Sequence, residues 1–584
     1  MERKAQIAVG VIAIIAVAAI VGGVVVFLLA PPSAETTLVF GTMYGPRRLD
    51  PMDSWDGASN QVLEQVVETL VAYDYEHVDS NGDWDYPLIP WLAESWSIDG
   101  TFLQYTFTLK QGVTFHDGTP FDANAVKFTF DRMLWALNAT GTNTVRVTRC
   151  AELYEFVDPI TQDMYSIINS TVVNSAYSVT IILNDPFAPF LDLLTYTSSS
   201  ILSPTSHPAD DYIVTGADDI LVGTGPFKYV SYETDVEVIM EKNENWWGGD
   251  IEIDKLVISV ITNDNARNAA LLSGDIHYLS DPMDELYDTF NLTRGIELYY
   301  QGQDWVIQYL GMNNIHINRT VREAISYAFD EEYLIDEIVY GHASRLKSAL
   351  PPGLKYYNGT LDQPRTNMSK AREIMQSMGY GGGFSLVDDA PWIAQSASAP
   401  FFTWNYTYNI GNPVREDVLI LMTNVLMKLG IRVEDAGMTW GDFLDRLYHT
   451  PPYTREDLRL YWIGWGPDYN DPINYINPLY TNRSIASNGA QYNGYTEAMV
   501  AGRDEMNLWD NVQLLMEAQI GESSDVIRGQ MFNRIQELLV AEDFAWVYGY
   551  VRVRACAYVD NLKGLEGASL SGFGREYFAY CYFE

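Results

Sequence analysis

The chain has 584 residues, of which 47% are hydrophobic, so it can bury more than one core and is expected to form two or three lobes. Its 77 acidic and 36 basic residues give a formal net charge of -41. That charge repels nucleic-acid phosphates and anionic membrane surfaces, which argues against nucleic acid as a partner.

The N-terminal segment predicts a membrane anchor. After Arg3 and Lys4, residues 7–30 carry no charge, and as a helix they span about 36 Å, enough to cross a bilayer. Cleavable signal peptides have shorter apolar cores, about 7–15 residues. We therefore expect residues 1–34 to be an uncleaved transmembrane helix and linker, with the rest of the chain outside the cell. A cleaved signal that ends near Ala30 or Ala34 is the alternative.

Asn-x-Ser/Thr triplets, which are possible glycan acceptors, agree with an external location. They are more frequent than this composition gives by chance and occur at Asn138, Asn169, Asn291, Asn318, Asn358, Asn367, Asn405 and Asn482. Together with the anchor, they suit an archaeal cell surface better than a bacterial periplasm.

Beyond the anchor, strand-like and helix-like stretches alternate, which predicts a mixed α/β fold. In the first part of the chain we expect strands over 37–41, 105–109 and 177–183 and helices over 58–73 and 122–135. Asp122 is a natural N-cap for the second of these helices.

Further along the chain, Gly223-Thr224-Gly225 forms a turn before a strand, with 236–241 as its hairpin partner. A phosphate-binding loop requires a helix after such a turn, so phosphate binding is not expected there. Periodicity predicts helices over 320–340, 413–430 and 528–539 and strands over 431–435 and 458–463.

Residues 465–472 read W-G-P-D-Y-N-D-P and directly follow the strand predicted over 458–463. Pro467 and Pro472 fix a turn, so Trp465 and Asp468 leave the end of a strand. In α/β folds, groups that contact ligands lie at such strand ends. Asp before Pro is also an ordinary turn former, so this segment needs support from the rest of the chain.

Three cysteines are present. Cys556 and Cys581 lie near the C-terminus on segments that suit neighbouring strands, and we expect a disulfide between them. Cys150 is far away in sequence and is expected to be a free thiol.

Several stretches occur in a characteristic order: L-D-P at 49–51, E-T-L-V-A-Y-D at 68–74, P-W-L-A-E-S-W at 90–96, F-T-L-K-Q-G-V-T-F-H-D-G-T-P-F at 107–121, G-T-G-P-F at 223–227 and the segment 318–329. With W-x-x-D-Y at 465–469, they resemble the solute-binding proteins of peptide and nickel ABC transporters, family 5, which include oligopeptide- and dipeptide-binding proteins. The resemblance covers nearly all of the chain after the anchor.

The resemblance implies a periplasmic-binding-protein-like type II α/β fold, with two lobes hinged on two crossing strands and an extra domain. The parts map onto this sequence as the first lobe (37–85, 217–304 and 545–584), the extra domain (86–216) and the second lobe (305–544). Closure of the lobes on a ligand would remove water and produce the conformation that the permease subunits recognise.

The resemblance also implies a ligand site. Asp468 is similar to the carboxylate that pairs with a peptide's α-ammonium, Trp465 and Tyr469 to its aromatic neighbours, and Trp440 to a tryptophan that lines the pocket. Tyr44 and Arg47, after the first external strand, are expected to face the cleft from the other lobe.

One position departs from the family pattern. Dipeptide binders clamp the peptide carboxylate with an Arg before the helix that leads to the turn at 429–431, and the counterpart here is around Asn409. Arg415 comes several residues later. Strict dipeptide specificity is therefore not expected, because an unpaired buried carboxylate is costly, and longer peptides or oligosaccharides fit better.

We therefore expect an extracellular, membrane-anchored binding protein of an ABC importer that delivers oligopeptides to a permease. The alternatives are an oligosaccharide-binding protein, since 15 Trp and 39 Tyr offer faces for sugar rings, and a surface structural or adhesive glycoprotein. The sequence has no H-E-x-x-H or G-x-S-x-G motif and its seven His are scattered, so neither an enzyme nor a cofactor is expected.

Overall fold

The computed structural model describes residues 35–54, 56–74, 86–157, 164–213, 221–447, 457–481, 488–565, 569–570 and 575–584, and the backbone of β1 (Val17–Ile20) and β2 (Gly23–Val26). β1 and β2 pair as an antiparallel hairpin, so strands stand where the N-terminal helix was expected, and the rest of 7–30 lies outside the described residues. No helix in the described part of the chain combines the length and apolar character of a bilayer span.

An eleven-stranded mixed sheet links the described parts of the molecule. Its strands are, in spatial order, β12 (Phe227–Glu233), β13 (Glu237–Lys242), β14 (Lys255–Val260), β3 (Thr37–Thr42), β15 (Tyr278–Leu279), β21 (Trp546–Val559), β16 (Ile296–Met312), β20 (Leu460–Trp465), β18 (Phe402–Asn409) and β19 (Ile431–Met438), with β17 (Ala343–Arg345) on β21. One half of the sheet comes from the ranges assigned to the first lobe and the other from the second.

The two longest strands, β16 and β21, lie in the middle of this sheet and pair antiparallel from Ile296 opposite Val559 to Gly311 opposite Trp546. The pairing shifts register between Gln303 and Ile307, so residues 304–306 form a bulge where the chain passes from one half of the sheet to the other. Both halves of the molecule are therefore joined by main-chain hydrogen bonds of the same two strands.

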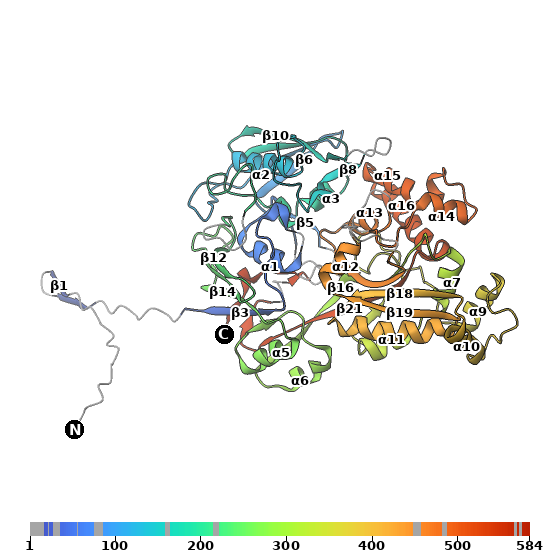
Figure 1. Cartoon of the computed structure of the whole chain (residues 1–584). Coiled ribbons are helices and arrows are strands. Elements are labelled where there is room, and N and C mark those ends of the chain that lie inside the picture. The colour runs from blue at the N-terminus through green and yellow to red at the C-terminus, as the bar shows by residue number, and fades with distance from the viewer. Residues whose placement is uncertain are drawn as a thin grey trace, which may run out of the picture.

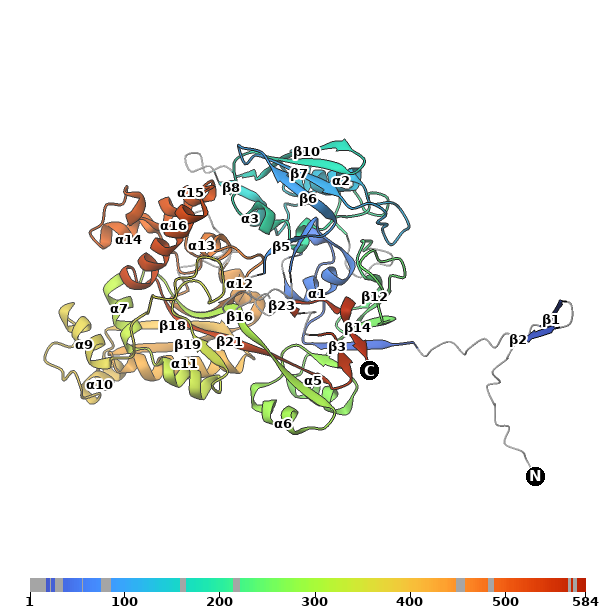
Figure 2. The same ribbon diagram turned by 180° about the vertical axis from the view of Figure 1, so that it is seen from behind.

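A separate four-stranded antiparallel sheet forms within 86–216, with strands in the order β10 (Ile168–Ser175), β11 (Ser178–Leu183), β7 (Gln104–Leu109) and β6 (Ala93–Ile98). Helix α2 (Ala123–Ala136) packs against β10 and β11. Figure 1 shows α2, β6 and β10 together above the large sheet, and Figure 2 shows the same group from behind.

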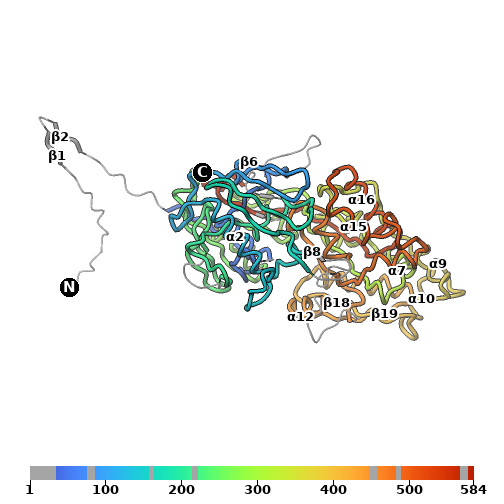
Figure 3. The backbone as a smooth tube through the Cα atoms, turned by 90° about the horizontal axis from the view of Figure 1, so that it is seen from above, coloured from blue at the N-terminus to red at the C-terminus, as the bar shows by residue number. Residues whose placement is uncertain are grey.

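Helices cover the large sheet. In the second lobe, α11 (Pro413–Met427) packs against β18 and β19, and α7 (Arg319–Ala328) packs against α9 (Met368–Ser377). Seen from above, the first-lobe and extra-domain elements lie beside those of the second lobe (Figure 3). The other helices are α1 (Gly57–Val66), α3 (Ala151–Tyr154), α4 (Phe190–Leu193), α5 (Asp264–Ser273), α6 (Tyr287–Leu292), α8 (Glu331–Tyr333), α10 (Ala390–Ser398), α12 (Trp440–Leu447), α13 (Ile473–Tyr480), α14 (Gly494–Val500), α15 (Val512–Ile520) and α16 (Asp525–Glu537).

Short strand pairs complete the structure: β4 (Val71–Tyr73) with β5 (Leu88–Pro90), β8 (Glu155–Val157) with β9 (Met164–Ser166), β22 (Leu562–Lys563) with β25 (Tyr582–Phe583), and β23 (Ser569–Leu570) with β24 (Arg575–Glu576). Most predicted strands and helices are confirmed to within a few residues. The helix predicted over 320–340 is divided, because α7 ends at Ala328 and Phe329 is extended before α8 and a π-helical turn over Leu334–Ile338. Asp122 caps α2, because its side chain accepts hydrogen bonds from the N–H groups of Asn124 and Ala125.

The helix predicted over 58–73 is wrong in its second half, because α1 ends at Val66. The next residue but one, Glu68, turns into the core, where its carboxylate accepts hydrogen bonds from Trp247 Nε1 (2.7 Å), Trp246 Nε1 (3.1 Å) and Thr224 Oγ1 (2.7 Å). Burial raises the pKa of Glu68 to about 7 despite these bonds. Contacts this distant in sequence outweigh the local helical periodicity.

Gly223 and Gly225 pack directly against the end of α1, which explains the glycines of this turn. A Cβ on Gly223 would lie 2.0 Å from the carbonyl oxygen of Val66, and one on Gly225 would lie 2.8 Å from that of Gln65. The turn therefore serves backbone packing, as expected for a turn that no helix follows.

The disulfide expected between Cys556 and Cys581 is wrong, because the structure has both as free, buried thiols, together with Cys150. Burial raises the pKa of Cys581 to about 12, and the neighbouring Cys556 adds to the shift.

A buried ion pair joins the extra domain to the first lobe. The Arg132 guanidinium, on α2, donates to both carboxylate oxygens of Asp50, at 3.0 and 2.5 Å, and the two side chains are almost fully buried. Asp50 also accepts from the N–H of Ile213 at 2.8 Å. The L-D-P stretch thus holds the position of α2.

We expect Arg132→Gln to lower the free energy of unfolding by about 3–5 kcal/mol, because it leaves the Asp50 carboxylate buried without its cation. Lys127→Gln, on the same helix, breaks only the exposed pair with Asp131 and should cost less than about 1 kcal/mol. Urea unfolding followed by circular dichroism measures both. Equal urea midpoints for the two variants would show that the buried pair of Arg132 with Asp50 does not stabilise the fold.

Candidate functional site

The segment after β20 is held in place by one asparagine of α13. Asn474 Oδ1 accepts from the N–H of Asp468 at 2.7 Å, and its Nδ2 donates to Asp468 Oδ2 at 2.9 Å. Its carbonyl oxygen accepts from Trp465 Nε1 at 2.9 Å. Trp465 and Asp468 are thus fixed relative to each other where the strand ends.

A second anchor of this segment is a buried ion pair. Arg528 of α16 donates to both oxygens of Asp471 at 2.5 and 2.7 Å, and its Nε donates to Gln519 at 3.0 Å. Asp471 also accepts from the N–H of Ile473, the first residue of α13. The D-P turn is therefore tied to the body of the second lobe on both sides.

Asp468 lies at the interface between the second lobe and the extra domain. The residue is only 8% exposed. Burial raises the pKa of Cys150 and of Tyr154, both in the extra domain, and the charge of Asp468 adds to both shifts. The carboxylate is therefore inside the molecule, facing the other half, and not on the outer surface.

Tyr73 connects three parts of the structure beside this segment. Its hydroxyl donates to Asp192 Oδ1 in the extra domain (3.0 Å) and accepts from the N–H of Asn470 in the second lobe (2.8 Å). Burial raises the pKa of Asp192 to about 7, the charge of Asp471 adds to this, and the bond from Tyr73 opposes it. We call this chain of two hydrogen bonds the Tyr73 bridge.

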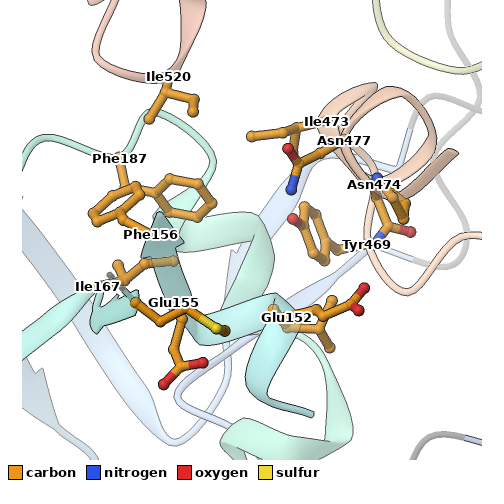
Figure 4. Close-up of a pocket in the computed structure, with 13 residues that line it drawn as sticks. Glu152, Glu155, Phe156, Ile167, Phe187, Tyr469, Ile473, Asn474, Asn477 and Ile520 are labelled. Carbon is orange, nitrogen blue, oxygen red and sulfur yellow. The ribbon is translucent and has the colours of Figure 1, made fainter. Parts of the chain in front are cut away.

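A small cavity of about 60 Å³ lies between the extra domain and the second lobe. Figure 4 shows Phe156, Ile167 and Phe187 on one side and Tyr469 and Ile473 on the other. Glu152 and Glu155 also line it, and burial raises the pKa of Glu155 to about 7. Tyr469, a predicted ligand contact, is thus at the boundary of the two bodies.

A larger and more polar cavity of about 330 Å³ lies beside the hinge strands. Its lining comes from three places: the first lobe after β15 (Asp281 and Tyr287), the hinge strands (Asp304, Gln308 and Arg554) and the start of α11 in the second lobe (Asn412 and Arg415). We call it the hinge cavity. Its volume is in the range of small-molecule sites, about 300–1,000 Å³.

Arg415 lies close to Asn409, the position around which the family pattern has an arginine. Its Nη1 donates to Oδ1 of Asn409, because β18 ends at Asn409 and the chain turns back into α11 within a few residues. The guanidinium also lies over the Trp440 ring, 5.6 Å from its centre. Arg415 therefore lies beside Asn409 in space although it comes six residues later in the sequence, and the expectation that the protein is not a strict dipeptide binder stays a prediction.

The remaining predicted residues are divided between the two lobes. Burial lowers the pKa of Arg415, and the tyrosine hydroxyls that oppose this shift include Tyr44. Tyr44, in the loop after β3, is 59% exposed. Trp440 is 39% exposed, at the start of α12. Arg47 is exposed, and its N–H donates to Ser59 Oγ at 2.9 Å. Of the six predicted ligand residues, Tyr469 lines the small cavity, and the other five are in the lining of neither cavity.

The glycan candidates also lie in different settings. Asn138, Asn169, Asn291, Asn318 and Asn367 are exposed, Asn358 and Asn405 are half-buried, and Asn482 lies outside the described residues. Among the residues that the structure describes, no group of three or more His, Cys, Asp or Glu side chains is placed to hold a metal ion.

Sequence reasoning missed Tyr73, Asp192 and Asp304. Tyr73 belongs to the E-T-L-V-A-Y-D stretch, which was used only as a family marker, and nothing in the sequence links it to Asn470, 397 residues away. Asp304 sits in the bulge of β16, which no sequence pattern indicated.

Comparison with known proteins agrees with this architecture. Residues 87–487 match the family model described as bacterial extracellular solute-binding proteins, family 5 middle. The chain is 28% identical over 487 residues to heme-binding protein A of Haemophilus influenzae (80% of each chain) and 25% identical over 475 residues to di/tripeptide-binding protein 1 of Pseudomonas aeruginosa (78% of this chain, 81% of the relative).

A solved structure has the same fold. The periplasmic binding protein DppA of Helicobacter pylori, in complex with the peptide STSA, superposes with a TM-score of 0.72 at 23% identity and covers 94% of this chain and 98% of its own. These findings confirm the family resemblance, the α/β binding-protein fold and a non-enzymatic binding role. The chain belongs to family 5 of the extracellular solute-binding proteins.

Proposed function

We propose that the protein captures oligopeptides between its lobes and delivers them to the permease of an ABC importer. The observation that carries this proposal is the position of Asp468, an acidic group at the boundary of the two bodies that is held by Asn474, a residue of the small cavity's lining. A carboxylate in such a place can pair with a peptide's α-ammonium in a charge-assisted hydrogen bond. The curated relatives named as di/tripeptide-binding proteins support the same ligand class.

A peptide fits the lining better than the alternative ligands do. The hinge cavity is bordered by arginine and aspartate side chains, which suit the charged groups of a peptide more than the hydroxyls of an oligosaccharide. Trp440, the exposed ring that would stack on a sugar, already has the Arg415 guanidinium over it. A purely adhesive glycoprotein would not need a cavity between two hinged bodies.

We also propose that residues 1–34 anchor the protein to the cell membrane and that the exposed sequons carry glycans. The support is the uncharged run 7–30 after Arg3 and Lys4, and the exposure of Asn138, Asn169 and Asn291. The division into a first lobe (37–85, 217–304 and 545–584), an extra domain (86–216) and a second lobe (305–544) is likewise proposed.

The Tyr73 bridge should stabilise the closed arrangement of the lobes. Tyr73→Phe removes the donor to Asp192 and the acceptor for the Asn470 N–H, and unsatisfied buried groups of this kind cost about 1–3 kcal/mol. We expect the dissociation constant for tri-alanine to rise about tenfold, measured by isothermal titration calorimetry.

Tyr165→Phe is the matched control, since Tyr165 donates to Asp185 within the extra domain at 2.8 Å. It should leave the affinity unchanged. If both variants bind like the wild type, the bridge has no part in closure.

Asp468→Asn keeps the shape of the side chain and removes its charge. Binding of tri-alanine should weaken by about 10- to 100-fold through the lost charge-assisted bond, while the unfolding midpoint stays close to that of the wild type. Asp388→Asn, an exposed acid of the same lobe, serves as the control. Unchanged calorimetric affinity of Asp468→Asn would remove this residue from the site.

Deletion of residues 1–34 should yield a protein that stays in the aqueous fraction and binds with the affinity of the full chain. Fractionation of cells that express either form, followed by calorimetry, checks both expectations. A full-length chain found in the aqueous fraction would refute the anchor.

A further inference from the structure

Five charged side chains line the hinge cavity. Arg552 and Arg554 come from β21, Arg415 from α11, Asp304 from the bulge of β16 and Asp281 from the chain after β15. Which of these charges are already paired within the protein decides what ligand the cavity can take.

Two of the arginines have carboxylate partners. Arg552 Nη1 lies 3.4 Å from Asp284 Oδ2, and Arg554 Nη2 donates to Glu576 Oε1 at 2.6 Å. Arg415 differs, because its hydrogen bond goes to the neutral amide of Asn409 and no described carboxylate forms an ion pair with it. Arg415 therefore offers a positive charge that the described part of the protein does not neutralise.

The two acids of the hinge cavity, Asp304 and Asp281, supply negative charge to it. Asp304 Oδ1 accepts from the N–H of Val306 at 2.9 Å, within its own bulge, and neither Asp304 nor Asp281 forms an ion pair with a described residue. Burial raises the pKa of Asp304 to about 6, although Arg554 and the Val306 N–H favour its charged form. A cationic group that enters the cavity would offset this cost of burial.

The hinge cavity is adjacent to the segment that carries Asp468. Gln308, which lines the cavity, pairs with Gly464 across β16 and β20, and the next pair is Ile307 with Trp465. The negative charges of Asp304 and Asp468 both raise the pKa of Tyr475, after the larger effect of its burial. Asp468, three residues after Trp465, is thus near this cavity without lining it, and a short peptide held there by its ammonium would extend toward the cavity.

We propose that the hinge cavity binds the C-terminal residue of the peptide and selects a basic one. Arg415 takes the α-carboxylate, while Asp304, with Asp281 beside it, takes the ammonium or guanidinium of the last side chain. The inference rests on the proposed function and adds a substrate class to it, namely peptides that end in lysine or arginine.

Three tripeptides test the two contacts separately on the detergent-solubilised full chain: Ala-Ala-Lys, Ala-Ala-norleucine, which lacks only the side-chain ammonium, and Ala-Ala-Lys-amide, which lacks the carboxylate. Calorimetry should give a dissociation constant for Ala-Ala-Lys about 10- to 100-fold lower than for either analogue, the effect of one charge-assisted bond.

Two variants should each remove one preference and keep the other. Arg415→Gln is expected to bind Ala-Ala-Lys and Ala-Ala-Lys-amide equally, while it still prefers Ala-Ala-Lys over Ala-Ala-norleucine. Asp304→Asn is expected to bind Ala-Ala-Lys and Ala-Ala-norleucine equally, while it still prefers Ala-Ala-Lys over Ala-Ala-Lys-amide. Because each variant retains one preference, loss of the fold cannot produce this crossed result.

The preference for lysine should also depend on pH. The groups that face Asp304 are Arg552 and Arg554 from β21, Asp281 from the chain after β15 and Tyr475 from α13. Since Asp304 becomes protonated as the pH falls through about 6, the ratio between lysine and norleucine peptides should be largest at pH 7.5 and fall below pH 6. Asp304→Asn should show no such change.

Equal binding of all three tripeptides overturns this inference and leaves the proposed function standing. Failure of all three to bind overturns the proposed function, and this inference with it.

Discussion

The pairing of β16 with β21 is the constraint on which the rest of the structure depends. These two strands carry main-chain hydrogen bonds through both halves of the large sheet, so neither half can separate from the other without breaking the centre of the sheet. The interruption of the pairing at 304–306 is the place where bending of these two strands breaks the fewest main-chain hydrogen bonds. Both cavities and the segment 465–472 lie where such bending changes the distance between the lobes.

Buried arginine–carboxylate pairs fix the parts that flank the hinge. Arg132 with Asp50 holds the extra domain, and Arg528 with Asp471 holds the segment that follows β20. The chain has only 36 basic residues, so few cations are available for such pairs. Removing the cation from a buried pair leaves an uncompensated charge and strongly destabilises the fold. Against this background Arg415, which lines a cavity between the lobes and bonds an amide, differs from the arginines that serve the fold.

The local elements were largely predictable from the sequence, because helix and strand periodicity and caps such as Asp122 act over a few residues. The end of α1 was not, since Glu68 leaves the helix to meet Trp246 and Trp247, which are almost 180 residues away. The same holds for the site. Trp465 and Asp468 could be placed at a strand end from their sequence, whereas the Tyr73 bridge depends on three segments that only the folded chain brings together. The contacts of Arg415 with Asn409 and Trp440 could not be read from the sequence, because they depend on how the chain turns between β18 and α11.

The place of β21 in the sheet has a consequence for biosynthesis. This strand belongs to the last 40 residues of the chain, yet it lies between β15 and β16 in the middle of the sheet. Until it emerges, the strands on either side present unpaired edges, which are prone to aggregate. The large sheet, which both lobes share, is therefore complete only after β21 has been synthesised and has paired with β15 and β16.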